Sequence, residues 1–130
     1  MKKVMIGILV AAAGGALSIS CGSSSGPGDS SGVPRTSTVG SLSPTQAATL
    51  CDWVNAKQGG YGRTVTCPDG SMSTTDTNQA ECVAGSAAAQ TACPTLTVAE
   101  TEDCTNAIGT NLCQISTASA CAAVATCLGY

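Results

Sequence analysis

The sequence predicts an all-α fold: a small disulfide-stapled bundle of about four helices, with a short β-hairpin or extended segment after the first helix. Three observations predict it. Residues 42–130 contain only 12 Leu, Ile and Val side chains, too few for a large apolar core. The same stretch contains eight cysteines, an even number that is typical of four disulfides in a small exported domain. Its local patterns are helix caps and alanine-rich runs.

The first helix is expected over residues 44–58. Ser43 and Gln46 form a capping box around a proline at the first helical position. The apolar stripe ends at Gly59-Gly60, and a glycine pair at this place is a common helix stop. The segment therefore carries both a start and a stop signal of its own.

A hairpin and a second helix are expected next. Residues 63–67 contain Thr-Val-Thr, and the Pro-Asp-Gly turn at 68–70 returns the chain through Met72 as a second short strand. Asp76, three residues before a glutamine, predicts the cap of an alanine-rich helix over residues 77–92. A proline follows this helix closely and ends it.

Two further helices complete the expected bundle. Thr97 and Glu100 form another capping box, which opens a third helix that should end at Gly109. A fourth helix is expected over residues 117–126, where alanines again dominate. Helices rich in alanine can pack closely, which suits a bundle with few large side chains.

The cysteines of residues 42–130 are predicted to form disulfides. They are Cys51, Cys67, Cys82, Cys93, Cys104, Cys113, Cys121 and Cys127. Eight cysteines allow 105 pairings, and the sequence excludes only Cys121 with Cys127, which lie too far apart along one helix. A zinc site is the rival interpretation, but it favours close C-x-x-C pairs that this spacing lacks, so no metal or cofactor is expected.

The N-terminus has the pattern of an export signal, expected to cover residues 1–20. Lys2 and Lys3 precede an uncharged apolar run at 4–17, and small residues follow up to Cys21. The run is shorter than the roughly 20 residues that span a bilayer. Export would place the mature chain in an oxidising compartment, where paired cysteines persist.

This N-terminal pattern resembles the signal peptide of bacterial lipoproteins. The resemblance covers about the first 25 residues and ends in Cys21-Gly-Ser, with Ser20 before the cysteine and Ser18 where that family prefers leucine. It implies that Cys21 becomes the first residue of the mature chain, carries lipid and anchors the protein to a membrane. Ser18 and Ser20 also suit the ordinary signal peptidase, so secretion of a soluble chain stays an alternative.

Residues 21–41 are predicted to be a disordered tether, because Ser and Gly dominate their composition. The folded domain is accordingly expected over residues 42–130. Without the signal, the chain has three basic and eight acidic residues, a net charge of −5. A mildly acidic chain with so few cations lacks the electrostatic footprint of a nucleic-acid-binding protein.

Candidate reactive groups are few. The chain has no histidine, which excludes His-dependent triads and His-containing metal sites. Asp52 and Glu81 are the weighed acid–base pair for glycoside hydrolysis, but no motif supports them. A serine activated by Lys57 is equally unsupported. The sequence therefore predicts a chain that is not an enzyme.

Two clusters have both a binding and a structural interpretation. Glu100, Glu102 and Asp103 could attract a cation, but acidic residues are favoured in the first turns of a helix, and this structural interpretation is preferred. Trp53 and Tyr61 are candidate contacts for a protein or glycan partner. Trp53 lies at the edge of the apolar stripe of its helix, so a place in the core is preferred for it.

The sequence thus predicts an exported, lipid-anchored, noncatalytic module of the bacterial envelope or surface, facing the periplasm or the exterior. Its expected partners are the membrane, through the lipid on Cys21, and an unknown protein or glycan. The alternative is a released disulfide-rich effector or inhibitor, for which a stapled scaffold is equally suited.

Overall fold

The computed structural model describes residues 28–130, and the expected signal peptide and Cys21 lie outside the described residues. Four α-helices form the fold: α1 (Pro44–Lys57), α2 (Gln79–Ala92), α3 (Val98–Ile108) and α4 (Ala122–Leu128). Strands β1 (Thr64–Thr66) and β2 (Met72–Thr74) pair antiparallel between α1 and α2. Three 3-10 turns complete it: η1 (Val39–Ser41), η2 (Leu112–Gln114) and η3 (Ser119–Cys121). The four helices and the short hairpin after the first of them are as predicted, but with this small sheet the fold is mixed rather than purely all-α.

Two of the four helices, α1 and α3, begin at the capping residue that the sequence predicts. Ser43 and Thr97 each accept a hydrogen bond from the backbone N–H three residues on, and both capping boxes are complete. The cap of α2 is Asn78 rather than Asp76, because the side chain of Asn78 accepts from the backbone N–H of Glu81. Helix α4 begins at Ala122, later than expected, after the 3-10 turn η3 and without a capping side chain.

All eight cysteines of the predicted set form disulfides. Cys51–Cys82 joins α1 to α2, and Cys104–Cys121 joins α3 to η3. The other two bridges are Cys67–Cys113 and Cys93–Cys127. The four-bridge prediction is confirmed, and Cys121 does not pair with Cys127. Such bridges are typical of an oxidising extracellular or periplasmic setting.

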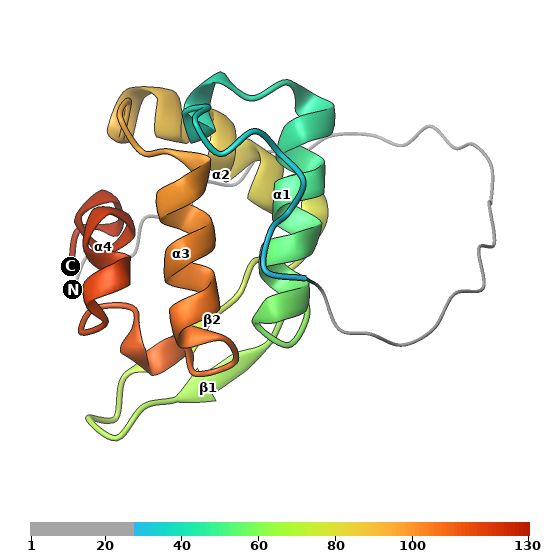
Figure 1. Cartoon of the computed structure of the whole chain (residues 1–130). Coiled ribbons are helices and arrows are strands. Elements are labelled where there is room, and N and C mark those ends of the chain that lie inside the picture. The colour runs from blue at the N-terminus through green and yellow to red at the C-terminus, as the bar shows by residue number, and fades with distance from the viewer. Residues whose placement is uncertain (1–27) are drawn as a thin grey trace, which may run out of the picture.

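Residues 28–41 pack against the helices, which corrects the predicted tether over this part of the chain. We call this segment the N-terminal strap. It runs across α1 and α3 in Figure 1, and its Val33 and Val39 belong to the main core cluster together with Trp53 and Val98. The strap contains no cysteine, so noncovalent contacts alone hold it against the helices.

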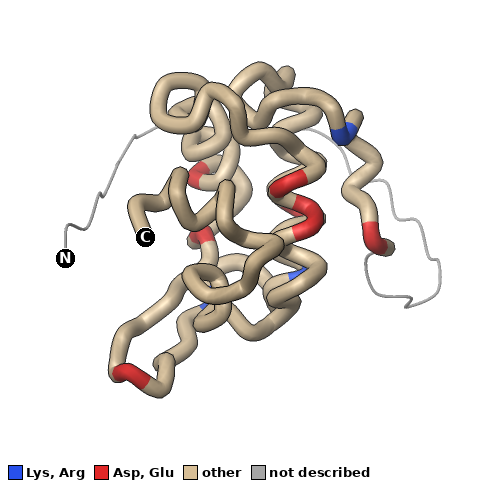
Figure 2. Tube along the Cα trace, turned by 60° about the vertical axis from the view of Figure 1, so that its left-hand side comes forward, with Lys and Arg blue, Asp and Glu red and all other residues tan. Residues whose placement is uncertain are grey.

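The arrangement of the helices places the strap on one side of the molecule. Helix α3 lies between α1 and α4 in Figure 1, and it contacts both. None of the helices within residues 28–130 has the length and apolar character that crossing a membrane requires. Charged residues are sparse on the fold, as Figure 2 shows.

Candidate functional site

The most elaborate polar site of the described chain is the contact between the N-terminal strap and α3. Its centre is Glu102, whose side chain has 0% solvent exposure. Its Oε1 accepts hydrogen bonds from the hydroxyl of Ser30 at 3.2 Å and from the backbone N–H and hydroxyl of Ser31, both at 2.7 Å. Its Oε2 accepts from Nη1 of Arg35 at 2.9 Å. A buried carboxylate is thus supplied with four donors by one short segment.

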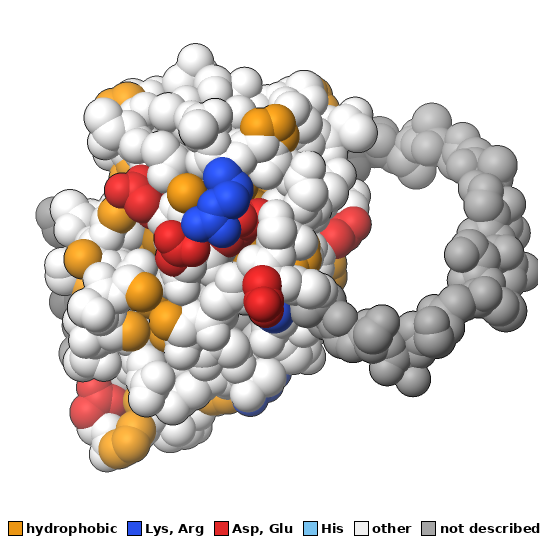
Figure 3. All heavy atoms as spheres, viewed as in Figure 1, with side chains coloured by type: hydrophobic (Ala, Val, Ile, Leu, Met, Phe, Trp, Pro, Cys, Tyr) orange, Lys and Arg blue, Asp and Glu red, His pale blue; other side chains and the backbone are white. Residues whose placement is uncertain are grey.

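Arg35 joins this buried group to the surface. Its side chain is 44% exposed, and its Nη2 donates to Oδ1 of Asp103 at 2.6 Å. The hydrogen bond to Asp103 is the main cause that raises the pKa of Arg35. In Figure 3 a basic side chain lies among acidic ones on this face. The guanidinium therefore bridges two carboxylates of α3, one buried and one exposed.

The strap also completes the N-terminus of α3. The first N–H groups of a helix have no partner within it. Here the N–H of Val98 donates to the carbonyl of Ser37 at 2.9 Å, and the N–H of Ala99 donates to that of Arg35 at 3.0 Å. The N–H of Val39 donates in return to the carbonyl of Leu96 at 2.8 Å. Strap and helix therefore depend on each other for their backbone hydrogen bonds.

The start of the strap is held at the C-terminal halves of α1 and α3. Nε1 of Trp53 donates to the carbonyl of Gly28 at 2.8 Å, and Nδ2 of Asn106 donates to the carbonyl of Asp29 at 2.8 Å. Nζ of Lys57 lies 3.4 Å from Oδ1 of Asp29 and 5.5 Å from the centre of the Trp53 ring. These contacts fix where the chain enters the fold.

The acidic cluster of α3 is thereby explained without a cation. Glu100 closes the capping box by accepting from Thr97, while Glu102 and Asp103 bind the strap. Within residues 28–130, no three Cys, Asp or Glu side chains gather in an arrangement that could hold a metal ion. The three acidic residues therefore have a structural role, as preferred above. Two of them bind the strap, so the helix dipole is not the only reason for their place on α3.

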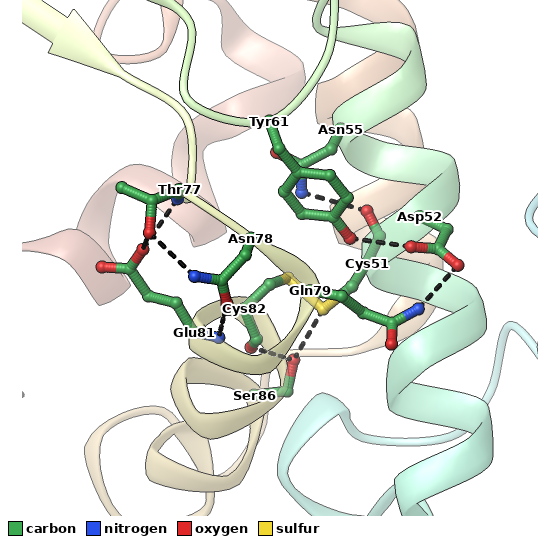
Figure 4. The surroundings of a disulfide bond; sticks show 10 residues. All are labelled: Cys51, Asp52, Asn55, Tyr61, Thr77, Asn78, Gln79, Glu81, Cys82 and Ser86. Atoms are coloured by element: carbon green, nitrogen blue, oxygen red, sulfur yellow. Dashed lines mark hydrogen bonds between the residues drawn. A yellow bond between two sulfur atoms is a disulfide. The ribbon is translucent and has the colours of Figure 1, made fainter. Parts of the chain in front are cut away.

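A second polar cluster lies beside the Cys51–Cys82 bridge, as Figure 4 shows. Asp52 on α1 accepts from the hydroxyl of Tyr61 at 2.8 Å and from Nε2 of Gln79 on α2 at 2.7 Å. Burial, and after it the hydrogen bond to Asp52, raise the pKa of Tyr61. The cluster links α1, α2 and the loop between them, next to a covalent bond that does the same.

Asp52 and Glu81, the candidate acid–base pair, each accept structural hydrogen bonds from different residues. Asp52 holds Tyr61 and Gln79, whereas Glu81 accepts from the backbone N–H of Thr77 at 2.7 Å. The Thr77 hydroxyl and N–H lower the pKa of Glu81. The two carboxylates share no hydrogen-bond partner. Lys57, the weighed activator of a serine, is bound to Asp29 instead.

The two candidate partner contacts differ in exposure. Trp53 is 7% exposed and belongs to the core cluster, so the preferred interpretation of this residue is confirmed. Tyr61 is half-buried, with its hydroxyl bound to Asp52. Trp53 therefore offers no ring face to a ligand, and the predicted aromatic pair does not form an exposed platform.

A buried amide lies near this second cluster. Asn55 is 1% exposed, and its Nδ2 donates to the carbonyl of Cys51 at 3.0 Å, while its Oδ1 has no partner within the described chain. The neighbouring Asp76 has a raised pKa, because burial disfavours its ionised form and outweighs a hydrogen bond from Asn55. Neither group lines the two open hollows described below.

Among the hollows of the described surface, two are open and adjoin a disulfide. The first, about 420 Å³, lies between the end of α2, the start of α3 and α4, and it contains the Cys93–Cys127 bridge and Glu100. The second, about 540 Å³, lies between the hairpin and η2. Its Arg63 donates through Nη1 to the carbonyls of Gln58 and Thr110, both at 2.7 Å. The charged group of each hollow is already engaged in holding the fold.

The sequence did not predict the docked strap, nor that Glu102 of the acidic cluster is its main partner. The signal for the strap was present in Val33, Val39 and Arg35, which interrupt the Ser- and Gly-rich composition.

Comparison with known proteins gives no match to this chain among family models, curated proteins or solved structures.

Proposed function

We propose that the chain is an exported, noncatalytic module of the bacterial envelope or surface, held to a membrane by lipid on Cys21. The observation that carries this proposal is the division of the nine cysteines. Eight of them form four disulfides within residues 51–127, so the ninth, Cys21, is left over in sequence at the end of an apolar signal-like run. A free thiol in an oxidising compartment is reactive, whereas an acylated one is inert.

The carboxylates of the described chain already accept hydrogen bonds within the fold, which supports a noncatalytic role. An acid–base or nucleophilic mechanism needs a titratable group that is free to act on a substrate in a cleft. In the described chain Asp52, Glu81, Glu100 and Glu102 all accept structural hydrogen bonds, and the hollows are open. The cross-linked scaffold is suited to presenting a surface to a partner.

The proposal is tested by the chemistry of the N-terminus. Wild type and Cys21→Ala are expressed in a bacterium that processes lipoproteins, and membranes are separated from soluble fractions. We expect the wild-type N-terminal peptide to begin at an acylated Cys21 and the protein to sediment with membranes. Cys21→Ala should lose both properties, whereas the nearby Ser24→Ala should keep them.

The opposite result identifies the alternative function. A wild-type chain that begins at an unmodified residue, or beyond Cys21, and stays soluble would overturn the anchored module. The released effector or inhibitor would then be the better assignment, since small disulfide-stapled domains survive outside the cell.

A further inference from the structure

We infer that the N-terminal strap fixes which face of the domain lies against the lipid headgroups: the end formed by the C-terminal halves of α1 and α3. The inference rests on the proposed anchoring through Cys21. It concerns the orientation of the domain, which the presence of a lipid does not by itself determine.

The point at which the chain enters the fold is well defined. The carbonyls of Gly28 and Asp29 are bound by Trp53 on α1 and Asn106 on α3, and the Asp29 carboxylate lies beside Lys57. From there the strap is held by four hydrogen bonds to Glu102, which has no solvent exposure. The anchored end of the chain therefore reaches the domain at one place and not at the predicted residue 42.

The remaining chain is short. Residues 22–27 separate Cys21 from Gly28, and even a fully extended chain over these seven steps spans at most about 25 Å. A compact domain of this size has a radius of gyration of about 13 Å, which for a sphere corresponds to a diameter of about 33 Å. To bring its opposite face to the lipid, the domain would have to lift Gly28 farther than the chain reaches.

Docking of the strap shortens the free chain between Cys21 and the domain. A chain free from Cys21 to residue 42, as the sequence predicted, would span about 70 Å when extended and would let the domain turn any face to the membrane. With residues 28–41 docked, the entry side must stay near the headgroups. The strap thus converts a flexible attachment into an oriented one.

The polar groups at the entry point and the exposed residues at the end of α4 agree with this orientation, whereas Met72 of the hairpin, 70% exposed, is a third exposed apolar side chain. The entry side presents polar groups, Asn106 and the pair of Asp29 with Lys57, which suit a hydrated headgroup layer. Leu128, the last residue of α4, and Tyr130, just after it, are 58% and 71% exposed, and α4 packs on the side of α3 away from α1 (Figure 1). The exposed apolar end of α4 would therefore face away from the lipid.

The test uses Trp53, the only tryptophan of the chain. The mature chain from Cys21, with its four disulfides intact, is coupled through the Cys21 thiol to a maleimide lipid in phosphatidylcholine vesicles containing a dansyl headgroup acceptor. This coupling sets the orientation question apart from natural lipidation. A Tyr130→Trp variant adds a second donor at the end of the chain and keeps the hydrogen bond of Trp53 to Gly28, so transfer from position 130 is obtained as the difference between this variant and wild type. We expect energy transfer from Trp53 to exceed that from position 130 by at least about twofold, because Trp53 binds the entry point whereas position 130 follows the helix that packs on the other side of α3.

Three further variants keep the wild-type donor. Insertion of 14 Gly and Ser residues after Gly26, or release of the strap by Glu102→Ala, should lower transfer from Trp53 because the domain can then rotate. Asp69→Ala, in the turn between β1 and β2, removes a charge whose hydrogen bonds go to Ser71 and not to the strap, and it should leave transfer unchanged. Equal transfer from positions 53 and 130, or transfer from Trp53 that the insertion does not alter, would overturn the orientation. Failure of acylation in cells would overturn only the anchoring.

Discussion

Arg35 and Glu102 lie 67 residues apart in sequence and meet in a 2.9 Å ion pair whose carboxylate is fully buried. A buried carboxylate is tolerated only where donors replace its water. Here the guanidinium, two hydroxyls and a backbone N–H do so, and all of them come from the strap. The pair therefore joins the N-terminal strap to the middle of α3.

Glu102→Ala should lower the free energy of unfolding by about 3 kcal/mol, because it removes one buried partner and leaves the donors of the strap unpaired. Urea unfolding measures the loss, and hydrogen exchange should become faster over residues 28–41. Asp103→Ala is the matched control, since it removes the exposed partner of the same arginine and should cost less than about 1 kcal/mol. Equal effects of the two substitutions would contradict the central place of Glu102.

Gly40→Ala should destabilise the fold through a clash in η1. A Cβ at position 40 would overlap the backbone of Gln90 on α2. Overpacking of this kind costs about 1–3 kcal/mol, since backbone cannot move aside as a side chain can. Gly28→Ala, where a Cβ meets nothing within 4 Å, should change stability by less than about 0.5 kcal/mol. Thermal unfolding of both variants compares them, and a neutral Gly40→Ala would show that this part of the strap is not docked.

Asp76→Asn should change how stability depends on pH. Burial raises the pKa of Asp76 above its unfolded value of 3.8, so the folded state binds this proton more tightly. The stability that this group contributes is therefore complete below that value and is lost as pH rises through the folded pKa. The uncharged asparagine avoids the loss, and the variant should gain stability relative to wild type as pH increases from 3 to 7.

Asp69→Asn is the control of opposite sign. Two hydrogen bonds from Ser71 lower the pKa of Asp69, so its contribution is present at neutral pH and is lost on acidification. Asp69→Asn should therefore lower the free energy of unfolding at pH 7 and leave it unchanged at low pH. Urea titrations at several pH values measure both variants, and parallel curves for Asp76→Asn and wild type would refute the assignment.

The disulfide pairing gives a fourth prediction. Peptic digestion without reduction should release peptides that join Cys51 to Cys82, Cys67 to Cys113, Cys93 to Cys127 and Cys104 to Cys121. Denaturing alkylation of the unreduced chain should label none of these eight residues. A linked peptide that joins Cys82 to Cys93 would show that α2 is cross-linked differently from the structure described above.

Local chemistry explains what the sequence could predict. The capping boxes at Ser43 and Thr97 act within four residues, and the Pro-Asp-Gly turn returns β1 onto β2 within one hairpin. Each signal stands beside the structure that it specifies. The starts of α2 and α4 were predicted less well, because Asn78 competes with Asp76 for the cap and α4 has no capping side chain.

Nonlocal contacts explain what the sequence could not predict. No local pattern selects one of 105 pairings of eight cysteines, since the choice depends on how the helices pack. The strap was missed because its Ser and Gly content resembles a linker, while its ordered state depends on Glu102, far along the chain. Composition describes what a segment can bury by itself, and here the buried groups are supplied by α3.

The strap also determines how the fold would bear mechanical load. A pull on the N-terminus meets the hydrogen bonds of residues 28–41 before it reaches Cys51, the first cross-linked residue of the described chain. Beyond that residue, covalent bridges tie all four helices together. Force applied at the N-terminal end should therefore peel the strap from α3 while the disulfides keep the helices joined, so the strap would lengthen the chain under load before any cross-linked part of the fold opens.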